Sequence, residues 1–422
     1  MSNPETIESL GLLPHYDLFI NGEFTPSTKP EDKCTSKSPV DGTVLSTFAD
    51  ATKEDVDKAV EAAWIAFKTW KNTTPQERSK VLNEIADAIE KNKEKLAKIE
   101  SMDNGKPIRE TMAVDIPSAV IQFRYFAGCI LAEEGSANVL DGKYLSLILR
   151  EPIGVVGQII PWNYPFLMGA MKLAPVLASG CCTIIKPSSE TSLSILELAR
   201  IIKDIIPKGV FNVITGRGSK SGQYLLDHPK ISKLAFTGST EVGREIALAA
   251  AKKIIPSTLE LGGKSANIFF DDCNFDHAND GAVMGILLSQ GEVCYAGSRI
   301  FVQDTFYDKF VDALIKQFNS VKVGHSMDPN TMMGAIVNEK QLNKILEYVK
   351  IGESEGCKIG CGGVRITENG LDKGFYMKPT LLLDVKNKMR VAQEEIFGPV
   401  AVVIKFHDVD EVIAMRMIQY MV

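Results

Sequence analysis

A cysteine in a glycine-bounded turn and a glutamate beside paired glycines are the residues of this sequence best suited to nucleophilic chemistry. Cys294 lies in such a turn rather than within an apolar strand. A thiolate in a loop with oriented N–H groups can act as a nucleophile. Glu260 precedes Gly262 and Gly263, and a carboxylate there can serve as a general base. Simpler interpretations exist for both, since a lone cysteine is usually a small core residue and a strand-end glutamate is usually exposed.

Asn163 supplies a third candidate group, a side-chain amide. It lies within residues 161–166, where a proline on either side stiffens the turn. An amide N–H held there can donate to a developing oxyanion. The alternative is an asparagine that only satisfies the backbone of its turn.

Three turns that follow apolar strands have the composition of ligand-binding loops. Lys186 begins one of them, at 186–190, where a lysine can contact hydroxyls or phosphates, although a βα turn with a serine N-cap explains it equally. Residues 236–243 open a helix whose N-terminal N–H groups suit a pyrophosphate, and 216–218 form a Gly-Arg-Gly turn. None matches G-x-G-x-x-G or a Walker A loop. Their recurrence on consecutive units favours a ligand site over three unrelated tight turns.

The elements that carry these turns alternate between strand and helix. The strands are expected at 154–160, 182–185, 210–214 and 233–236, and the helices at 166–178, 191–206, 221–227 and 241–253. Four successive βα units predict a parallel sheet covered by helices on both faces. Ligands of such sheets bind at the carboxyl ends of the strands.

The flanking regions predict further elements. Residues 18–24 form an expected hairpin around Asn21-Gly22, and 133–150 a second one around Asp141-Gly142. Between them, about 53–130 has helical periodicity. A second α/β domain is expected after Gly263. Its strands are expected near Ile268, Ile300 and Val402, and its helices at 305–320 and 339–354.

Composition excludes several classes of protein. The 422 residues suggest two or three domains, and 47 basic against 53 acidic residues, without a basic stripe, argue against a nucleic-acid partner. No run approaches the roughly 18 apolar residues that span a bilayer. The first sixteen residues carry Glu5 and Glu8 and no basic cluster, so neither a signal nor a transit peptide is expected. The eight cysteines lack C-x2-C spacing, which predicts no metal site and a cytoplasmic protein with reduced thiols.

Taken together, the sequence resembles the NAD(P)-dependent aldehyde dehydrogenase superfamily. Six motifs occur in the family's order, and 34 positions separate Glu260 from Cys294. The motifs lie at 161–165, 186–188, 236–239, 260–264, 291–299 and 394–399. The resemblance covers residues 18–415 and implies oxidation of an aldehyde.

The resemblance implies four catalytic residues. The Cys294 thiolate attacks the aldehyde carbon, and the Asn163 amide and the Cys294 N–H form the oxyanion hole. Hydride then passes to the nicotinamide and leaves a thioester, which a water activated by Glu260 hydrolyses. Lys172 matches a lysine common in the family. Relatives that transfer the acyl group to coenzyme A generally lack the glutamate, so a free acid is the expected product and an acylating dehydrogenase the alternative.

The resemblance also implies NAD or NADP as the cofactor. Lys186 is expected at the adenosine ribose, Ser239 at the pyrophosphate, and Glu395 at the nicotinamide ribose, with Phe397 beside it. The other expected cofactor-binding residues are Ile159, Pro161, Trp162, Ser189, Gly218, Phe236, Gly238, Val242 and Leu261. Ser189 departs from many NAD-preferring relatives, which carry a glutamate there, so the choice between NAD and NADP stays open; Glu190 could replace that glutamate in part.

The expected fold is α/β and aldehyde dehydrogenase-like. Residues 16–131 and 151–262 would form a Rossmann-type cofactor domain, 132–150 an oligomerisation hairpin, and 263–422 a catalytic domain. The family suggests a homodimer or homotetramer.

The expected substrate is a small or medium aliphatic aldehyde. Its tunnel is expected to be lined by Tyr164, Met171, Val293 and Tyr295, of which Met171 and Val293 are apolar. Betaine aldehyde would require an aromatic cage, to which Tyr164 could contribute one wall.

The last residues depart from the family. Members usually continue several tens of residues beyond the strand that ends near Phe406, whereas the helix begun at Asp408 runs into an apolar tail. This predicts a truncated or frame-disrupted member with an exposed edge, and it leaves a degenerate dinucleotide-binding protein as an alternative.

Overall fold

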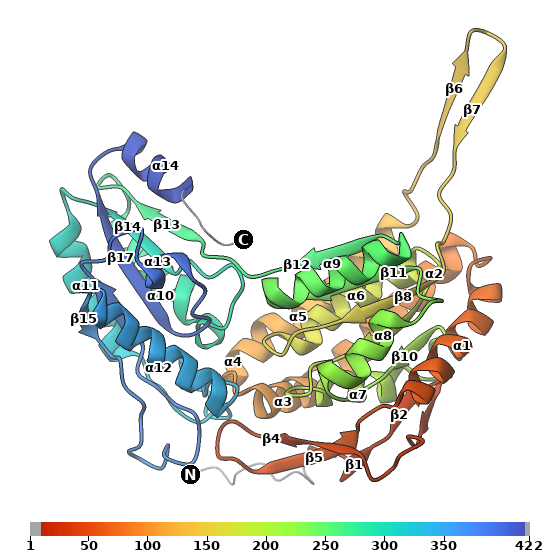
Figure 1. The fold of residues 1–422 in the computed structure, drawn as a ribbon, viewed down its shortest axis with the longest axis horizontal. Helices are drawn as coiled ribbons and strands as arrows, with labels where there is room; N and C mark the ends of the chain where they lie inside the picture. The colour runs from red at the N-terminus through yellow and green to blue at the C-terminus, as the bar shows by residue number, and fades with distance from the viewer. Residues whose placement is uncertain (1–9, 418–422) are drawn as a thin grey trace. The chain divides into compact units, whose positions relative to one another are not determined.

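The structure is a computed structural model that describes residues 10–417, and these residues form two compact units (Figure 1). Unit 1 comprises residues 10–36, 44–100 and 112–260, and unit 2 comprises 37–43, 101–111 and 261–417. Two short segments, 37–43 and 101–111, therefore belong to the second unit although they lie early in the chain. The expected domain ranges had placed both segments in the cofactor domain.

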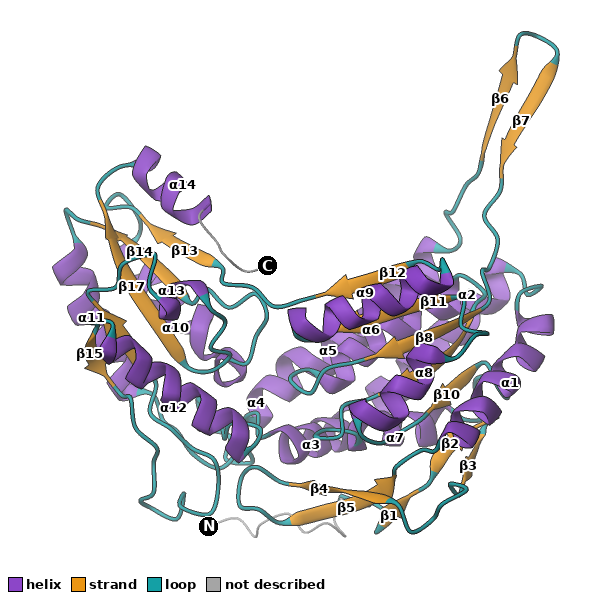
Figure 2. Ribbon diagram, in the orientation of Figure 1, coloured by secondary structure: helices purple, strands orange, loops and turns teal. Residues whose placement is uncertain are grey.

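A seven-stranded sheet forms the centre of unit 1 (Figure 2). Its order is β12 (Ser257–Glu260), β11 (Lys233–Thr237), β8 (Val155–Ile159), β9 (Cys182–Lys186), β10 (Phe211–Val213), β2 (Leu18–Ile20) and β3 (Glu23–Thr25). The first five strands are parallel, which confirms the sheet predicted from the βα alternation. The hairpin β2–β3 is also confirmed: Asn21 and Gly22 have φ of 55° and 81°, as a type I′ turn requires.

The helices of unit 1 follow the predicted order. They are α1 (Lys53–Trp70), α2 (Pro75–Lys91), α3 (Lys93–Asn104, whose last turn belongs to unit 2), α5 (Ile116–Cys129), α6 (Pro165–Ala178), α7 (Leu193–Ile202), α8 (Gln223–Asp227) and α9 (Thr240–Lys253). Helix α1 packs against β8, β9 and β10, whereas α9 packs against β11 and β12. Every residue of β9 is buried, as expected for an inner strand of a parallel sheet with both faces covered.

Two smaller sheets complete unit 1. The hairpin of β6 (Ser136–Leu140) and β7 (Tyr144–Ile148) projects from the rest of the unit (Figure 1, yellow). Asp141 and Gly142 at its tip have φ of 51° and 64°, which confirms the second predicted turn. A three-stranded sheet of β1 (His15–Tyr16), β5 (Val44–Ala49) and β4 (Lys33–Lys37) was not predicted.

Unit 2 is built on a five-stranded sheet. Its order is β13 (Ala266–Phe269), β14 (Arg299–Gln303), β17 (Val400–Phe406), β16 (Thr380–Leu383) and β15 (Lys358–Cys361), of which only β15 is antiparallel to its neighbour. Helices α10 (Phe275–Leu287), α11 (Tyr307–Ser320) and α12 (Glu339–Ser354) accompany it, so the predicted second α/β region is confirmed. Strands β15 and β16, each of four residues, were not predicted.

The C-terminal helix α14 (Val409–Met417) confirms the helix expected after Asp408. The apolar tail from residue 418 lies outside the described residues, as do the first nine residues of the N-terminal segment. Among residues 10–417, no helix is both long enough and apolar enough to cross a membrane. Within the same residues, no group of three or more His, Cys, Asp or Glu side chains could hold a metal ion.

Candidate active site

The register of the parallel strands brings the predicted residues of unit 1 to one edge of the sheet. Ile159 pairs with Lys186 and with Phe236, and Thr237 pairs with Glu260. Because parallel strands end on the same side, the loops that follow β8, β9, β11 and β12 are neighbours. These four loops or strand ends carry Asn163, Lys186, the 236–239 turn and Glu260.

Asn163 lies in the short connection between β8 and α6 and is 5% exposed. The helix after it begins with Pro165, which needs no N–H partner at this position. The next N–H, of Phe166, donates to Glu100 Oε1 at 3.1 Å. A buried carboxylate thus fixes the start of α6 and, through it, the turn that holds Asn163.

Lys172 and Glu260 line the same cavity in unit 1, which has a volume of about 480 Å³. Met168, Met171 and Pro175 of α6 form an apolar wall of this cavity, and Gln158 and Thr237 contribute polar groups. The side-chain amide of Gln158 also donates to the backbone carbonyl of Lys172 at 2.7 Å. The cavity therefore combines an amine, a carboxylate and an apolar surface.

The amine of Lys172 is electrostatically unusual. Burial lowers its pKa to about 8, and the nearby Glu260 carboxylate opposes that shift only in part. Desolvation disfavours the charged amine more than one exposed carboxylate favours it. An amine with this pKa can exchange a proton near neutral pH.

Lys186 ends β9, is buried, and donates from Nζ to the carbonyl of Pro187 at 2.8 Å. Burial lowers its pKa to about 8, whereas the neighbouring Cys34 and Asp50 favour the charged form. A hydroxyl or phosphate that approached this amine would restore part of its lost solvation.

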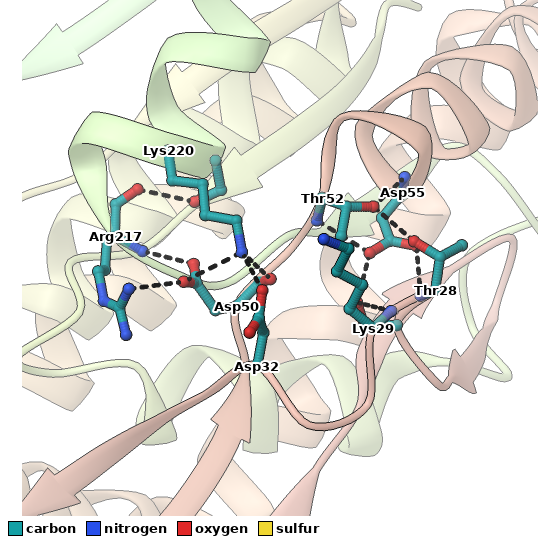
Figure 3. A network of polar contacts seen from close by, with 10 residues as sticks. Thr28, Lys29, Asp32, Asp50, Thr52, Asp55, Arg217 and Lys220 are labelled. Atoms are coloured by element: carbon teal, nitrogen blue, oxygen red, sulfur yellow. Dashed lines mark hydrogen bonds and ion pairs between the residues drawn. The ribbon is translucent and has the colours of Figure 1, made fainter.

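A network of charges holds the turn that contains Gly218 (Figure 3). Asp50 accepts the backbone N–H of Arg217 at 3.0 Å, and Lys220 donates to Asp32 at 2.7 Å and to Asp50 at 3.4 Å. A Cβ at Gly216 would lie 2.3 Å from the Asp50 carboxylate. The fully buried Asp50 therefore requires glycine at 216 and fixes the turn.

The N-terminus of α9 forms the remaining predicted turn. Ser239 is its N-cap, and its hydroxyl accepts the N–H of Val242 at 3.4 Å. Both Ser239 and Val242 are exposed, and Phe236 packs beneath Gly238. The end of a 14-residue helix with an exposed first turn is suited to an anionic group.

In unit 2, the Cys294 loop lies beside the Gly262-Gly263 step. A Cβ at Gly263 would lie 3.1 Å from the Cys294 carbonyl oxygen. Cys294 itself is half-buried. Its neighbour Val293 is buried, whereas Tyr295 is 69% exposed. Backbone contact with a glycine therefore brings this loop against the segment that follows Glu260 in the chain.

The carboxylate of Glu395 occupies the other side of the same step. Its Oε1 accepts the Gly263 N–H at 3.2 Å, and a Cβ at Gly262 would lie only 2.1 Å from its Oε2. Burial raises the pKa of Glu395, while the Gly263 N–H and the amines of Lys344 and Lys264 oppose that shift. The paired glycines are thus the reason that Cys294 and Glu395 can both approach this backbone.

The predicted residues divide between the two units. Asn163, Lys172 and Glu260 belong to unit 1, with Lys186, Ser189 and the 236–242 turn, whereas Cys294 belongs to unit 2, with Leu261, Glu395 and Phe397. Within unit 1, the cavity includes Met171 but not Tyr164, whose side chain is buried. Ile159, Pro161, Trp162 and Ser189 are half-buried, close to the ends of β8 and β9.

Several supporting residues were missed in the sequence. Met168 precedes Met171 by three positions, a helical spacing that could have placed both on one wall. Glu100 and Asp50 carry no such signal, because each contacts a backbone N–H far away in the chain. Their buried carboxylates become recognisable only once the chain has folded.

Comparisons with known proteins agree on one family. The family model described as "Aldehyde dehydrogenase family" matches residues 24–416. An aldehyde dehydrogenase of Deinococcus radiodurans is 48% identical over 399 residues, which cover 93% of this chain and 77% of the relative. The structure of an aldehyde dehydrogenase from Bacillus cereus with NAD+ is 40% identical, with a TM-score of 0.93, and the match covers 96% of this chain and 82% of that one. Betaine aldehyde dehydrogenase from Staphylococcus aureus, also with NAD+, is 37% identical with a TM-score of 0.94, covering 98% and 82% of the two chains.

The burial of Lys172 predicts a titration well below that of ordinary lysines. After reductive methylation with 13C, one dimethylamine signal is expected to titrate near pH 8, against an ordinary value of 10.5, and to vanish in Lys172→Arg. Between those two pH values the unfolded chain binds more protons than the folded chain at this site, so the contribution of Lys172 to stability rises with pH. A Lys172 signal that titrates with the exposed lysines would contradict the assignment.

Proposed function

This chain belongs to the aldehyde dehydrogenase family, and we propose from that premise that it oxidises an aldehyde with NAD(P) through a covalent adduct on Cys294. The observation that best supports the covalent route is the Gly262-Gly263 step. It is contacted on one side by the Cys294 backbone and on the other by the Glu395 carboxylate. A nucleophile and a ribose-binding carboxylate would be neighbours in such a site.

The residues of unit 1 fit a dinucleotide. Lys186 offers a buried amine at the end of β9, and the first turn of α9 offers an exposed helix N-terminus at Ser239. A Cβ at Gly218 would meet no atom within 4 Å, so the turn after β10 leaves space for a ligand. We assign these three positions to the adenosine ribose, the pyrophosphate and the adenine side of NAD(P), respectively.

In the proposed first step, the Cys294 thiolate attacks the carbonyl carbon and forms a thiohemiacetal. The side-chain amide of Asn163 and the backbone N–H of Cys294 stabilise the oxyanion, each donor contributing about 10²–10³-fold. NAD(P), when bound, would supply the acceptor for the hydride that leaves as the carbonyl re-forms. The acyl group then remains bound to the Cys294 sulfur as a thioester.

In the second step, Glu260 takes a proton from a water that attacks the thioester. The carbon–sulfur bond breaks, the free acid leaves, and the Cys294 thiolate is regenerated. Lys172 lines the same cavity with a pKa of about 8, so it can receive a proton from Glu260. We assign it that role in clearing the proton. The presence of Glu260 favours hydrolysis over transfer to coenzyme A.

The cavity wall supports a small or medium aliphatic substrate. Met168, Met171, Pro175 and Val176 supply apolar surface, and no aromatic ring lines the cavity among the described residues. A quaternary ammonium group is normally held by aromatic faces. We therefore do not propose betaine aldehyde as the substrate, although a betaine aldehyde dehydrogenase is 37% identical to this chain.

Ser189 supports the acceptance of both NAD and NADP. It lies three positions beyond Lys186, half-buried at the end of β9. A carboxylate at such a position binds the ribose 2′-hydroxyl of NAD and repels the 2′-phosphate of NADP. A serine does neither strongly, so both cofactors are proposed to bind.

The β6–β7 hairpin supports assembly into a homo-oligomer. Val139 pairs with Leu145 and Ala137 with Leu147, so the apolar side chains of Val139, Leu145 and Leu147 share one face. Their exposed fractions are 70%, 65% and 57%. An exposed apolar face of this kind marks an association surface. We propose that a second copy of the chain covers it.

The two-step mechanism predicts different defects for its two central residues. Cys294→Ala should abolish NADH formation with a short aliphatic aldehyde. Glu260→Gln should keep the first-turnover burst but lower steady-state turnover by about 10²-fold or more, because the amide cannot accept the water proton. Rapid-mixing absorbance measures both, and Cys273→Ala, a change to another half-buried cysteine of unit 2, should be normal. Substantial NADH formation by Cys294→Ala would exclude the covalent route, and acyl-CoA in excess of free acid would favour the acylating alternative.

The cofactor proposal predicts a change of preference in Ser189→Glu. The kcat/KM with NADP should fall by about 10-fold, equivalent to about 1.4 kcal/mol of repulsion, while that with NAD is kept or improved. Ser189→Gln, which has similar size without the charge, separates repulsion from steric exclusion. A strong NAD preference in the unmodified chain would contradict the role given to Ser189.

The assembly proposal predicts that charge on the apolar face dissociates the oligomer. Leu145→Glu combined with Leu147→Glu should reduce the mass measured by size exclusion with light scattering to that of one chain, because burying two carboxylates is costly. Asn138→Glu, on the opposite face of the hairpin, is the matched control. An unmodified chain that is already monomeric would refute the proposal.

A further inference from the structure

The turn that precedes Cys294 is strained. Ser289 and Gln290 have φ of 49° and 57°, and Gly291 follows at 72°. A residue with a Cβ pays free energy in this left-handed region, because the Cβ approaches the following carbonyl oxygen. Such strain persists only where the surroundings over-determine it, and it clusters at functional sites. Ser289 and Gln290 lie five and four positions before the proposed nucleophile, so this strained turn requires an anchor.

A buried carboxylate from a distant segment provides that anchor. Oε2 of Glu110 accepts the backbone N–H of Ser289 at 2.8 Å, although 179 residues separate them in the chain. Glu110 is 4% exposed and Ser289 is fully buried. The other carboxylate oxygen lies 3.4 Å from the Arg109 guanidinium, which favours the charged form. A charge-assisted hydrogen bond of this kind is among the strongest polar contacts in proteins.

The segment that carries Glu110 is itself fixed within unit 2. The N–H of Ile108 donates to the carbonyl of Ser326 at 2.7 Å, and Nε of Arg109 donates to the carbonyl of Thr331 at 3.1 Å. Both bonds tie α4 (Ile108–Glu110) to the loop between α11 and α12. The anchor thus has a rigid base.

The residues between the strained turn and Cys294 are also held in place by hydrogen bonds and close contacts. The N–H of Glu292 donates to the carbonyl of Ser289 at 2.9 Å, and Oε1 of Glu292 accepts the N–H of Val337 at 3.1 Å. A Cβ at Gly291 would lie 2.2 Å from the carbonyl oxygen of Gly398. Gly291 and Glu292, which lie between the Glu110 contact and Cys294, are therefore both held by neighbouring segments.

We propose that Glu110 is a positioning residue: its carboxylate holds the left-handed turn 289–291 and thereby sets the Cys294 thiol for attack. This inference rests on the proposed function, because it takes Cys294 as the nucleophile. Glu110 makes no contact with substrate in this role. It acts on the turn through its hydrogen bond with the Ser289 N–H.

The first test compares Glu110→Ala with Glu110→Gln. The alanine variant should lower the rate of the NADH burst by about 10-fold or more, the scale expected for a lost charge-assisted hydrogen bond. Its dissociation constant for NADH, measured by fluorescence, should stay within twofold. Glu110→Gln keeps an acceptor oxygen at the same reach and should retain most of the burst rate.

A second variant tests the strain itself. Glycine adopts the conformation of Ser289 without the Cβ penalty, so the turn would need its anchor less. Adding Ser289→Gly to Glu110→Ala should therefore recover several-fold of the burst rate. The Ser289 hydroxyl has no hydrogen-bond partner among the described residues, so its removal costs no polar contact seen there. A purely structural role for Glu110 predicts no such recovery.

Asp55 provides the matched control. It is also a buried carboxylate that accepts backbone N–H groups, from Thr28 and Thr52, both at 3.0 Å (Figure 3). Asp55→Ala should lower the thermal midpoint but leave the burst rate unchanged, because this cap lies in unit 1 at the start of α1. If Glu110→Ala does not fold, Glu110→Asp, which withdraws the carboxylate by one methylene, is expected to slow the burst while remaining folded.

The inference is overturned if folded Glu110→Ala or Glu110→Asp keeps the unmodified burst rate while Cys294→Ala is inactive. It is also overturned if Ser289→Gly brings no recovery. An active Cys294→Ala would instead refute the proposed function, so the two failures can be distinguished.

Discussion

Parallel pairing of β12, β11, β8 and β9 is the constraint on which the site of unit 1 depends. The pairs that link Ile159 to Lys186 and to Phe236, and Thr237 to Glu260, align four strand ends that are far apart in the chain. No helix or turn could align these groups alone. Since every residue of β9 is buried, a slip of one residue would move each side chain to the opposite buried face and disrupt its packing, so the register is strongly specified.

Close backbone approach plays the corresponding part in unit 2. Gly262 and Gly263 admit the Glu395 carboxylate and the Cys294 carbonyl at distances that any Cβ would obstruct. Gly291 admits the carbonyl of Gly398 in the same way. Glycines thus act here through the missing side chain rather than through flexibility. The space that a side chain would occupy at these glycines is filled by backbone carbonyl groups and by the Glu395 carboxylate.

Buried carboxylates recur as supports for these loops. Glu100 fixes the start of α6, Asp50 fixes the turn at Gly218, and Glu110 holds the turn before Cys294. Each accepts a backbone N–H that no regular secondary structure satisfies. An unpaired buried N–H is costly, so every such loop needs a partner of this kind. A carboxylate also adds charge-assisted strength to the bond.

The sequence alone determined the local features: the two hairpin turns at Asn21-Gly22 and Asp141-Gly142, the βα alternation, and the motifs that identify the family. These follow from contacts between near neighbours in the chain, which composition and spacing encode directly. Only the tertiary structure decided which segment joins which unit, as with 101–111, and which distant carboxylate meets which N–H. Such pairings depend on how separate segments pack, and the residues around a glutamate in the sequence do not indicate which distant N–H it will contact.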